Sequence, residues 1–259
     1  MKPIIKSRSK TILVILLAIT IMYILVVSSA PLRRLSTLKK QVYNDSIFYA
    51  RNNSILKNSN LFELAKTKSR KEAELILAQK DTFGLVVDIK DSTIWLMLKG
   101  VQIHGAKIKG FEQDRFFKAL NPLVFTCLFS KPLRTKQEFS SIVKEPIIIK
   151  KAPKDTIEAI NNAFMPDTLI QNPAYFRLDL ENRFRLILVQ KDFLTLDEKK
   201  VEKQFKQDIL KRKIADNARC FMPWKKAVYT PTLVLYLNAN EIRSIYRSIP
   251  ENALVILTY

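Results

Sequence analysis

An uncharged apolar run near the amino terminus constrains this chain more than any other feature. The run is TILVILLAITIMYILVVSSA, from Thr11 to Ala30. A helix rises 1.5 Å per residue, so a helix over this run is about 30 Å long, which is the thickness of the hydrocarbon core of a bilayer. A cleaved signal peptide is the alternative, because Ser28 and Ala30 have the spacing of a cleavage site. Pro31 would follow that cut directly, so we interpret the run as an uncleaved transmembrane anchor.

Basic residues flank this run on both sides, with a short leader before it and a long domain after it. Such a leader favours a cytoplasmic amino terminus and a domain on the outer side of the membrane. Further on, Ser69 with Glu72 at the capping-box distance predicts a helix over Ser69–Gln79. We therefore divide the chain into a cytoplasmic leader (1–10), a transmembrane anchor (11–30), a stem and helix (31–80) and a folded domain (81–259).

The composition favours an anionic partner. Lys and Arg number 44 against 24 Asp and Glu, which gives a net charge of +20. Lipid head groups, acidic envelope polymers and nucleic acids are all attracted by such a charge. Nucleic acid is the least favoured of the three, because of the predicted anchor and because no RNA-recognition motif occurs. Only 4 Gly are present and no glycine-rich phosphate loop occurs, so nucleotide hydrolysis is disfavoured.

The spacing of apolar residues changes after Phe83 and predicts a β-rich domain. Gly84–Gly110 is typical of three strands in a meander, and Ala174–Gln190 of a hairpin with its turn at Glu181 and Asn182. Further elements are predicted as strands over Leu123–Phe129 and Glu145–Lys151 and as helices over Asp155–Phe164 and Leu196–Ala218. The last helix is predicted to face inward with Val201, Phe205, Ile209 and Ile214. The predicted fold class is α+β, a mostly antiparallel β domain with a few helices, preceded by one transmembrane helix.

Two segments of this domain share a pattern with a known family. LVVDIKDSTIWLMLKG (Leu85–Gly100) predicts a strand, a turn and a second strand, and LYLNANEIRSIYRSIPENALVIL (Leu235–Leu257) predicts a strand, a helix ended by a proline step and a last strand. Together they resemble the L,D-transpeptidases that cross-link bacterial peptidoglycan. The resemblance implies an L,D-transpeptidase-like fold on the outer side of a bacterial inner membrane.

The catalytic motif of that family is missing here. On the same register, the nucleophilic cysteine of the family falls on Val234, a histidine falls on Thr232 and an arginine falls on Tyr236. A valine side chain forms neither a thiolate nor an acyl-enzyme. The resemblance therefore implies a catalytically inactive domain with degenerate-site positions at Thr232, Val234 and Tyr236, with no catalytic residues, no cofactor and no metal site.

Two other interpretations stay open. An active thiol transpeptidase could use Cys127 or Cys220 in a rearranged site, with the single histidine, His104, as its base. Alternatively, the chain is a basic, membrane-tethered binder of anionic polymers unrelated to the family, because a strand, an amphipathic helix and a proline stop occur in many α/β domains. The two cysteines could also form a disulfide outside the cytoplasm.

The favoured function is a membrane-anchored, non-catalytic module of the cell envelope. Its expected partners are peptidoglycan or another anionic envelope polymer, the membrane through Thr11–Ala30, and an envelope protein complex.

Overall fold

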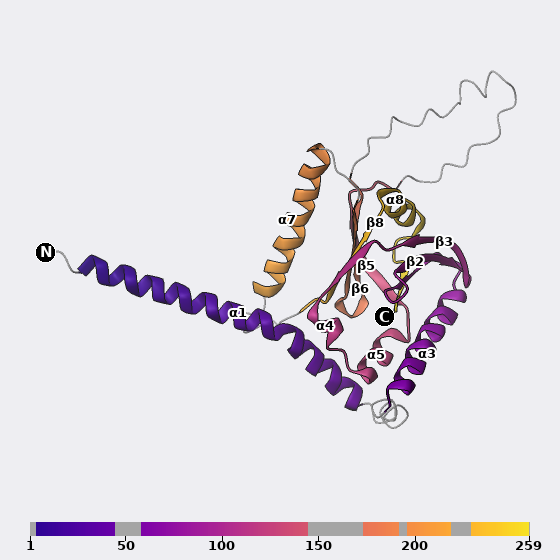
Figure 1. Cartoon of the computed structure of the whole chain (residues 1–259), viewed down its shortest axis with the longest axis horizontal. Coiled ribbons are helices and arrows are strands. Elements are labelled where there is room, and N and C mark those ends of the chain that lie inside the picture. The colour runs from indigo at the N-terminus through magenta and orange to yellow at the C-terminus, as the bar shows by residue number, and fades with distance from the viewer. Residues whose placement is uncertain (1–3, 45–57, 145–172, 192–195, 219–228, 259) are drawn as a thin grey trace, which may run out of the picture.

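The fold is a closed β domain with helices on its outer faces and one long helix that projects from it (Figure 1). This computed structural model describes residues 4–44, 58–144, 173–191, 196–218 and 229–258. The strand predicted over Glu145–Lys151 and the helix predicted over Asp155–Phe164 lie outside the described residues.

Nine strands form the sheet in the order β3-β2-β1-β9-β5-β6-β7-β8-β4. Most neighbouring strands are antiparallel, whereas β1 with β9 and β7 with β8 are parallel. The strands are β1 (Gly84–Asp88), β2 (Thr93–Leu98), β3 (Val101–Lys107), β4 (Gly110–Gln113), β5 (Leu133–Ser140), β6 (Tyr175–Leu180), β7 (Arg185–Gln190), β8 (Thr232–Leu237) and β9 (Leu254–Thr258). The predicted meander, hairpin and carboxy-terminal strand-helix-strand unit are confirmed, as is the mostly antiparallel α+β class.

One bent strand closes the sheet on itself. Only Ile108 and Lys109 separate β3, which pairs with β2, from β4, which pairs with β8. The amide of Ile108 donates to the Ser92 carbonyl oxygen at 2.8 Å, and the amide of Lys109 donates to the Tyr236 carbonyl oxygen at 2.8 Å. Consecutive parts of the same strand therefore form the two ends of the strand order, each paired on one side in the described residues.

The central strands are buried on both faces because helices cover the outside of the sheet. Leu85 and Val87 on β1 point into the interior core, whereas Val86 points outward. Helix α3 (Ser59–Ala78) covers Val86 with Ala73 and Leu77, both fully buried. This double burial explains why β1 and β7 are continuous apolar runs rather than alternating ones.

Helix α7 (Leu196–Ala218) covers the outer face of β6 to β8 (Figure 1). Phe205 is 5% exposed and Ile209 packs against the same cluster, as predicted. The prediction for Ile214 was wrong, because its side chain is 49% exposed. A helix of 23 residues is about 35 Å long, whereas a six-residue strand such as β7 spans about 20 Å, so the end of α7 extends beyond the sheet. The side chain of Val201 is not among those that the structure describes.

The strand predicted over Leu123–Phe129 is instead a helix, α5 (Pro122–Phe129), which follows the short helix α4 (Arg115–Lys118). Asn121 caps α5, since its Oδ1 accepts a hydrogen bond from the amide of Leu123 at 2.9 Å, and Pro122 suits the first helical position. Nearly every side chain of α5 is buried. A short helix with apolar residues at nearly every position has no clear amphipathic period, which is why the sequence pattern resembled a buried strand.

The amino-terminal helix α1 (Ile4–Asn44) is long and apolar enough to cross a membrane, with a mean hydropathy of 2.8 in its most apolar window. It continues through Pro31, where the sequence predicted its end. Leu38 and Val42 are buried in the core of the domain, and this packing offsets the backbone hydrogen bond that a proline removes. Residues expected to form a stem are thus helical and packed on the domain.

The helix expected to start at Ser69 begins ten residues earlier, because Asn58 supplies the cap of α3 and Ser69 is buried within it. At the other end of the chain, α8 (Ala239–Ser248) packs Ile242, Ile245 and Tyr246 against the interior core.

Candidate functional site

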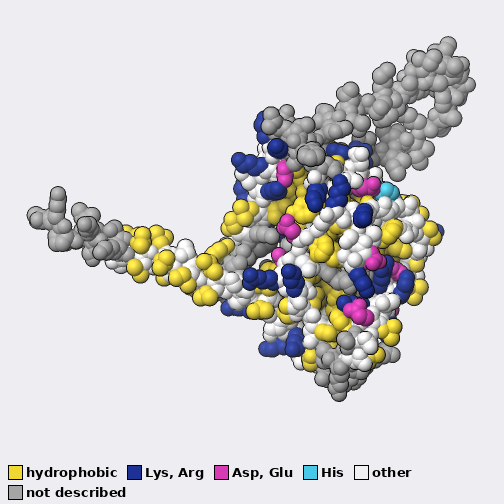
Figure 2. Space-filling model, in the orientation of Figure 1, with side chains coloured by type: hydrophobic (Ala, Val, Ile, Leu, Met, Phe, Trp, Pro, Cys, Tyr) yellow, Lys and Arg dark blue, Asp and Glu magenta, His cyan; other side chains and the backbone are white. Residues whose placement is uncertain are grey.

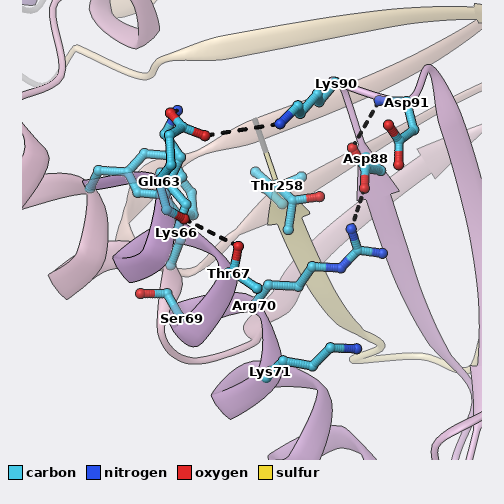
Figure 3. Close-up of a pocket in the computed structure, with 13 residues that line it drawn as sticks. Glu63, Lys66, Thr67, Ser69, Arg70, Lys71, Asp88, Lys90, Asp91 and Thr258 are labelled. Atoms are coloured by element: carbon cyan, nitrogen blue, oxygen red, sulfur yellow. Dashed lines mark hydrogen bonds and ion pairs between the residues drawn. The ribbon is translucent and has the colours of Figure 1, made fainter. Parts of the chain in front are cut away.

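A pocket of about 390 Å³ opens between α3, α5 and the ends of two parallel strands (Figure 3). Strands β1 and β9 run in the same direction and pair Asp88 with Thr258, so their carboxyl ends meet at one edge. Helix α3 crosses that edge and turns Arg70 toward Asp88. This volume is that of a site for a small ligand, and the carboxyl ends of parallel strands are common binding positions.

An ion-pair network fixes the wall of the pocket. Asp88 is 2% exposed, and one of its oxygens accepts a hydrogen bond from Nη1 of Arg70. Its other oxygen accepts one from the amide of Asp91 at 3.1 Å, a contact typical of aspartate at a turn. Arg70 also donates from Nε to Glu74 at 2.8 Å, and Lys71 pairs with Glu74 at 2.7 Å. Arg70 is therefore held by two carboxylates and does not move freely.

The pocket is lined by exposed lysines, by the carboxylates of Glu63 and Asp91, and by apolar side chains. Lys71 is 70% exposed, and Lys90 is 73% exposed with its nearest carboxylate, Glu63, at 3.9 Å. Phe125 and Phe129 from α5 line the floor. Exposed ammonium groups above an apolar surface suit a ligand with a carboxylate and an apolar or sugar-like body.

The acid dependence of stability follows from Glu74. Burial works against its ionised form, but the hydrogen bonds from Lys71 and Arg70 outweigh burial and hold the pKa of Glu74 below its usual range. A carboxylate with a lowered pKa stabilises the fold above the pKa of the unfolded chain, and that contribution is lost as pH falls through the folded pKa.

We expect Glu74→Gln to lower the free energy of unfolding by about 1 kcal/mol at neutral pH, because two charge-assisted hydrogen bonds are lost at a partly exposed site. Urea unfolding at a series of pH values measures this. The difference between the variant and the parent should shrink below pH 4.5, the ordinary value for glutamate. A constant difference across the series would contradict the role assigned to Glu74.

The degenerate-site positions all lie on β8, away from this pocket. Thr232 is buried and its amide donates to Oδ2 of Asp114 at 2.8 Å. Val234 and Tyr236 point to the outer face of the sheet and pack against the cluster of Phe205 on α7. Among the described residues, the cluster with Phe205 therefore covers part of this face beside Val234.

Tyr236 is held in a polar contact at the edge of that cluster. Its hydroxyl donates to Oε1 of Glu112 on β4 at 2.6 Å. Partial burial and the Glu112 carboxylate raise the pKa of Tyr236 to about 12. The phenol therefore remains neutral in the physiological range and does not replace the positive charge of an arginine.

His104 and the cysteines do not form a nucleophile and base pair in the described part of the chain. Nε2 of His104 lies 2.7 Å from Oε2 of Glu241 on α8. Cys127 is exposed on α5, which lies at the opposite end of the domain from α8 (Figure 1). Cys220 lies outside the described residues. Among the residues that the structure describes, no cluster of His, Cys, Asp or Glu side chains could hold a metal ion.

Comparisons with protein-family models, with curated proteins and with solved structures find no match to this chain. The function therefore has to be argued from the pocket, the charges and the long helix.

Sequence reasoning missed the pocket because it assigned Arg70 and Lys71 to the stem helix. A signal was available in the spacing of Lys66 and Arg70, which places two cations on one face of a helix. The sequence does not show which residues form the other walls of the pocket, because Asp88, Phe125 and Thr258 come from three distant segments.

Proposed function

We propose that this protein is a membrane-anchored, non-catalytic module of the bacterial cell envelope that binds a carboxylate-bearing ligand in the pocket beside Arg70. The favoured ligand is a stem peptide of peptidoglycan, in line with the resemblance to L,D-transpeptidases. The domain would lie on the outer side of the inner membrane.

The observation that carries this proposal is the polar pocket on a domain that packs directly onto a helix of membrane-spanning length. Peptidoglycan stem peptides have several carboxylates, and Lys71 and Lys90 present ammonium groups at the rim. A ligand that binds there would be held close to the membrane surface, where peptidoglycan precursors are delivered.

Absence of catalysis is supported by the chemistry of β8. On the register of the proposed resemblance, Val234 falls on the family's nucleophile, and the hydroxyl of Tyr236 donates to Glu112. Acyl transfer needs a nucleophile and a nearby base, and His104 is instead next to Glu241. Binding is therefore the favoured activity of the domain.

We expect the full chain in detergent to bind a disaccharide-tetrapeptide muropeptide, and the double variant Lys71→Gln, Lys90→Gln to bind it about tenfold or more weakly, because two charged contacts are lost. Microscale thermophoresis measures both affinities. The matched control is Lys136→Gln, an exposed lysine on β5 outside the pocket, which should leave the affinity unchanged. The proposal is wrong if the parent chain does not bind the muropeptide. If Lys136→Gln weakens binding as much as the double variant does, binding depends on the overall positive charge and not on the pocket.

The same preparation tests the alternative of an active thiol enzyme. After incubation with a carbapenem, the intact mass of the protein should stay unchanged. A covalent adduct on Cys127 or Cys220 would overturn the non-catalytic assignment.

A further inference from the structure

Two arginines from distant parts of the chain meet where α1 joins the domain. Arg34 lies on α1, about one turn beyond Ala30, the end of the apolar run. Arg183 lies in the turn between β6 and β7, in the 3₁₀ helix η2 (Glu181–Arg183). The Nη2 of Arg34 donates to the carbonyl oxygen of Asn182 at 3.1 Å, so the turn is bound to the helix.

The two positive charges are close and uncompensated in the described part of the chain. The charge of Arg183 acts unfavourably on that of Arg34, which is half-buried. Neither guanidinium forms an ion pair with a carboxylate of the described residues. The Nε of Arg34 is buried, and no described group accepts its hydrogen bond. Packing therefore holds this charge in place without a counter-ion from the residues that the structure describes.

The backbone of the turn makes Arg183 an unusual choice at its position. Asn182 and Arg183 have φ values of 56° and 58°. Asparagine and glycine tolerate this left-handed conformation, whereas other L-residues lose roughly 1 kcal/mol in it. Strain of this kind at an exposed turn is compatible with a functional role for the side chain.

The position of the pair corresponds to the head-group layer of a membrane. If Thr11–Ala30 crosses the hydrocarbon core, Arg34 lies about 6 Å beyond it, at the depth of the lipid phosphates. Arg33 is exposed beside it. Figure 2 shows Lys and Arg side chains (dark blue) gathered on the domain where the projecting helix joins it.

We propose that Arg34 and Arg183 together bind the phosphate group of an anionic phospholipid. Planar guanidinium groups bind phosphate oxygens through paired hydrogen bonds, and a bound phosphate removes the repulsion between the two arginines. The site rests on the proposed membrane anchoring and is separate from the pocket beside Arg70. Because its two halves come from the helix and from the sheet, lipid binding fixes the orientation of the domain on the membrane.

The test uses the full chain in nanodiscs of phosphatidylcholine with a minor fraction of phosphatidylglycerol. Native mass spectrometry after release counts the lipids that stay bound, and co-elution with the discs reports insertion. We expect the parent chain to retain phosphatidylglycerol in preference to phosphatidylcholine. Arg183→Asn keeps the left-handed turn but removes the charge, so it should lower this preference about fivefold while unfolding at the same or a higher temperature in pure phosphatidylcholine.

Two further arms make the result specific. Arg247→Gln removes a charge on α8, at the end of the domain away from α1 (Figure 1), and should leave the preference unchanged. Arg34→Gln should lower the preference as Arg183→Asn does. The inference alone is overturned if the chain inserts but shows no lipid preference, if Arg183→Asn retains that preference, or if inorganic phosphate in pure phosphatidylcholine discs stabilises the chain as well as the lipid does. A chain that does not insert overturns the anchoring and the lipid site together.

Discussion

Replacing Arg70 with methionine should lower the free energy of unfolding by about 3–5 kcal/mol, because it leaves the buried carboxylate of Asp88 without its positive partner. The side chain of Asp88 is 3% exposed, whereas that of Arg70 is 31% exposed. Water can therefore replace the missing partner of Arg70 but not that of Asp88. Methionine retains most of the apolar stem, so the loss reports the charge rather than a cavity. Chemical unfolding followed by circular dichroism measures it.

The control is the reciprocal variant, Asp88→Asn, because Arg70 and Asp88 differ in their exposure to water. Asp88→Asn keeps an oxygen that accepts the hydrogen bond from the amide of Asp91, and it leaves only the better solvated Arg70 without this partner. It should therefore lower the free energy of unfolding clearly less than Arg70→Met does. Equal losses for both variants would contradict the burial argument. A small loss for Arg70→Met would mean that the network does not hold the pocket wall.

Replacing Phe184 with alanine should lower the free energy of unfolding by about 3–5 kcal/mol, the usual range for a buried aromatic residue. Phe184 is 1% exposed and joins three elements through its ring. Its centroid lies 5.8 Å from that of Phe116 and 5.9 Å from that of Phe117 on α4, and 5.7 Å from that of Phe129 on α5. For a domain of this size the midpoint of thermal unfolding should fall by about 10 °C, as measured by calorimetry.

A matched variant separates this ring cluster from apolar contact in general. Phe139→Ala removes the same side chain at a position that is 41% exposed and stacked on Phe205. It should lower the free energy of unfolding by about 1 kcal/mol, because much of that ring already contacts water. Comparable losses at the two positions would show that Phe184 does not join the helices to the sheet.

The strands of this fold could be predicted because their apolar periods are local. The meander after Phe83, the hairpin around Asn182 and the strand-helix-strand ending were all predicted correctly from spacing and turn residues. Helix α5 was not predicted, because a short segment that is apolar at nearly every position has no clear period. Its capping residue, Asn121, also lies just outside the apolar run. The uncharged run likewise ended the predicted anchor at Ala30, whereas α1 continues to Asn44 and packs on the domain.

The candidate site was harder to predict than the fold. The pocket and the arginine pair each join residues far apart in the sequence: Arg70 with Asp88 and Thr258, and Arg34 with Arg183. Which strands end side by side depends on the parallel pairing of β1 and β9, and nothing in the order of the elements along the chain reveals that pairing. The sequence shows which residue stands at each of these positions, but not which residues lie beside it in the folded domain.

The position of β9 also has a consequence for biosynthesis. This strand includes Thr258, one residue from the carboxy terminus, yet it lies in the interior of the sheet between β1 and β5. A nascent chain from which β9 has not yet emerged has β1 paired with β2 alone, so the sheet is completed only once β9 is available. Long-range pairing of this kind also slows folding. A chain that ends before Leu254 would lose an internal strand of the sheet, so we expect it not to reach the native fold.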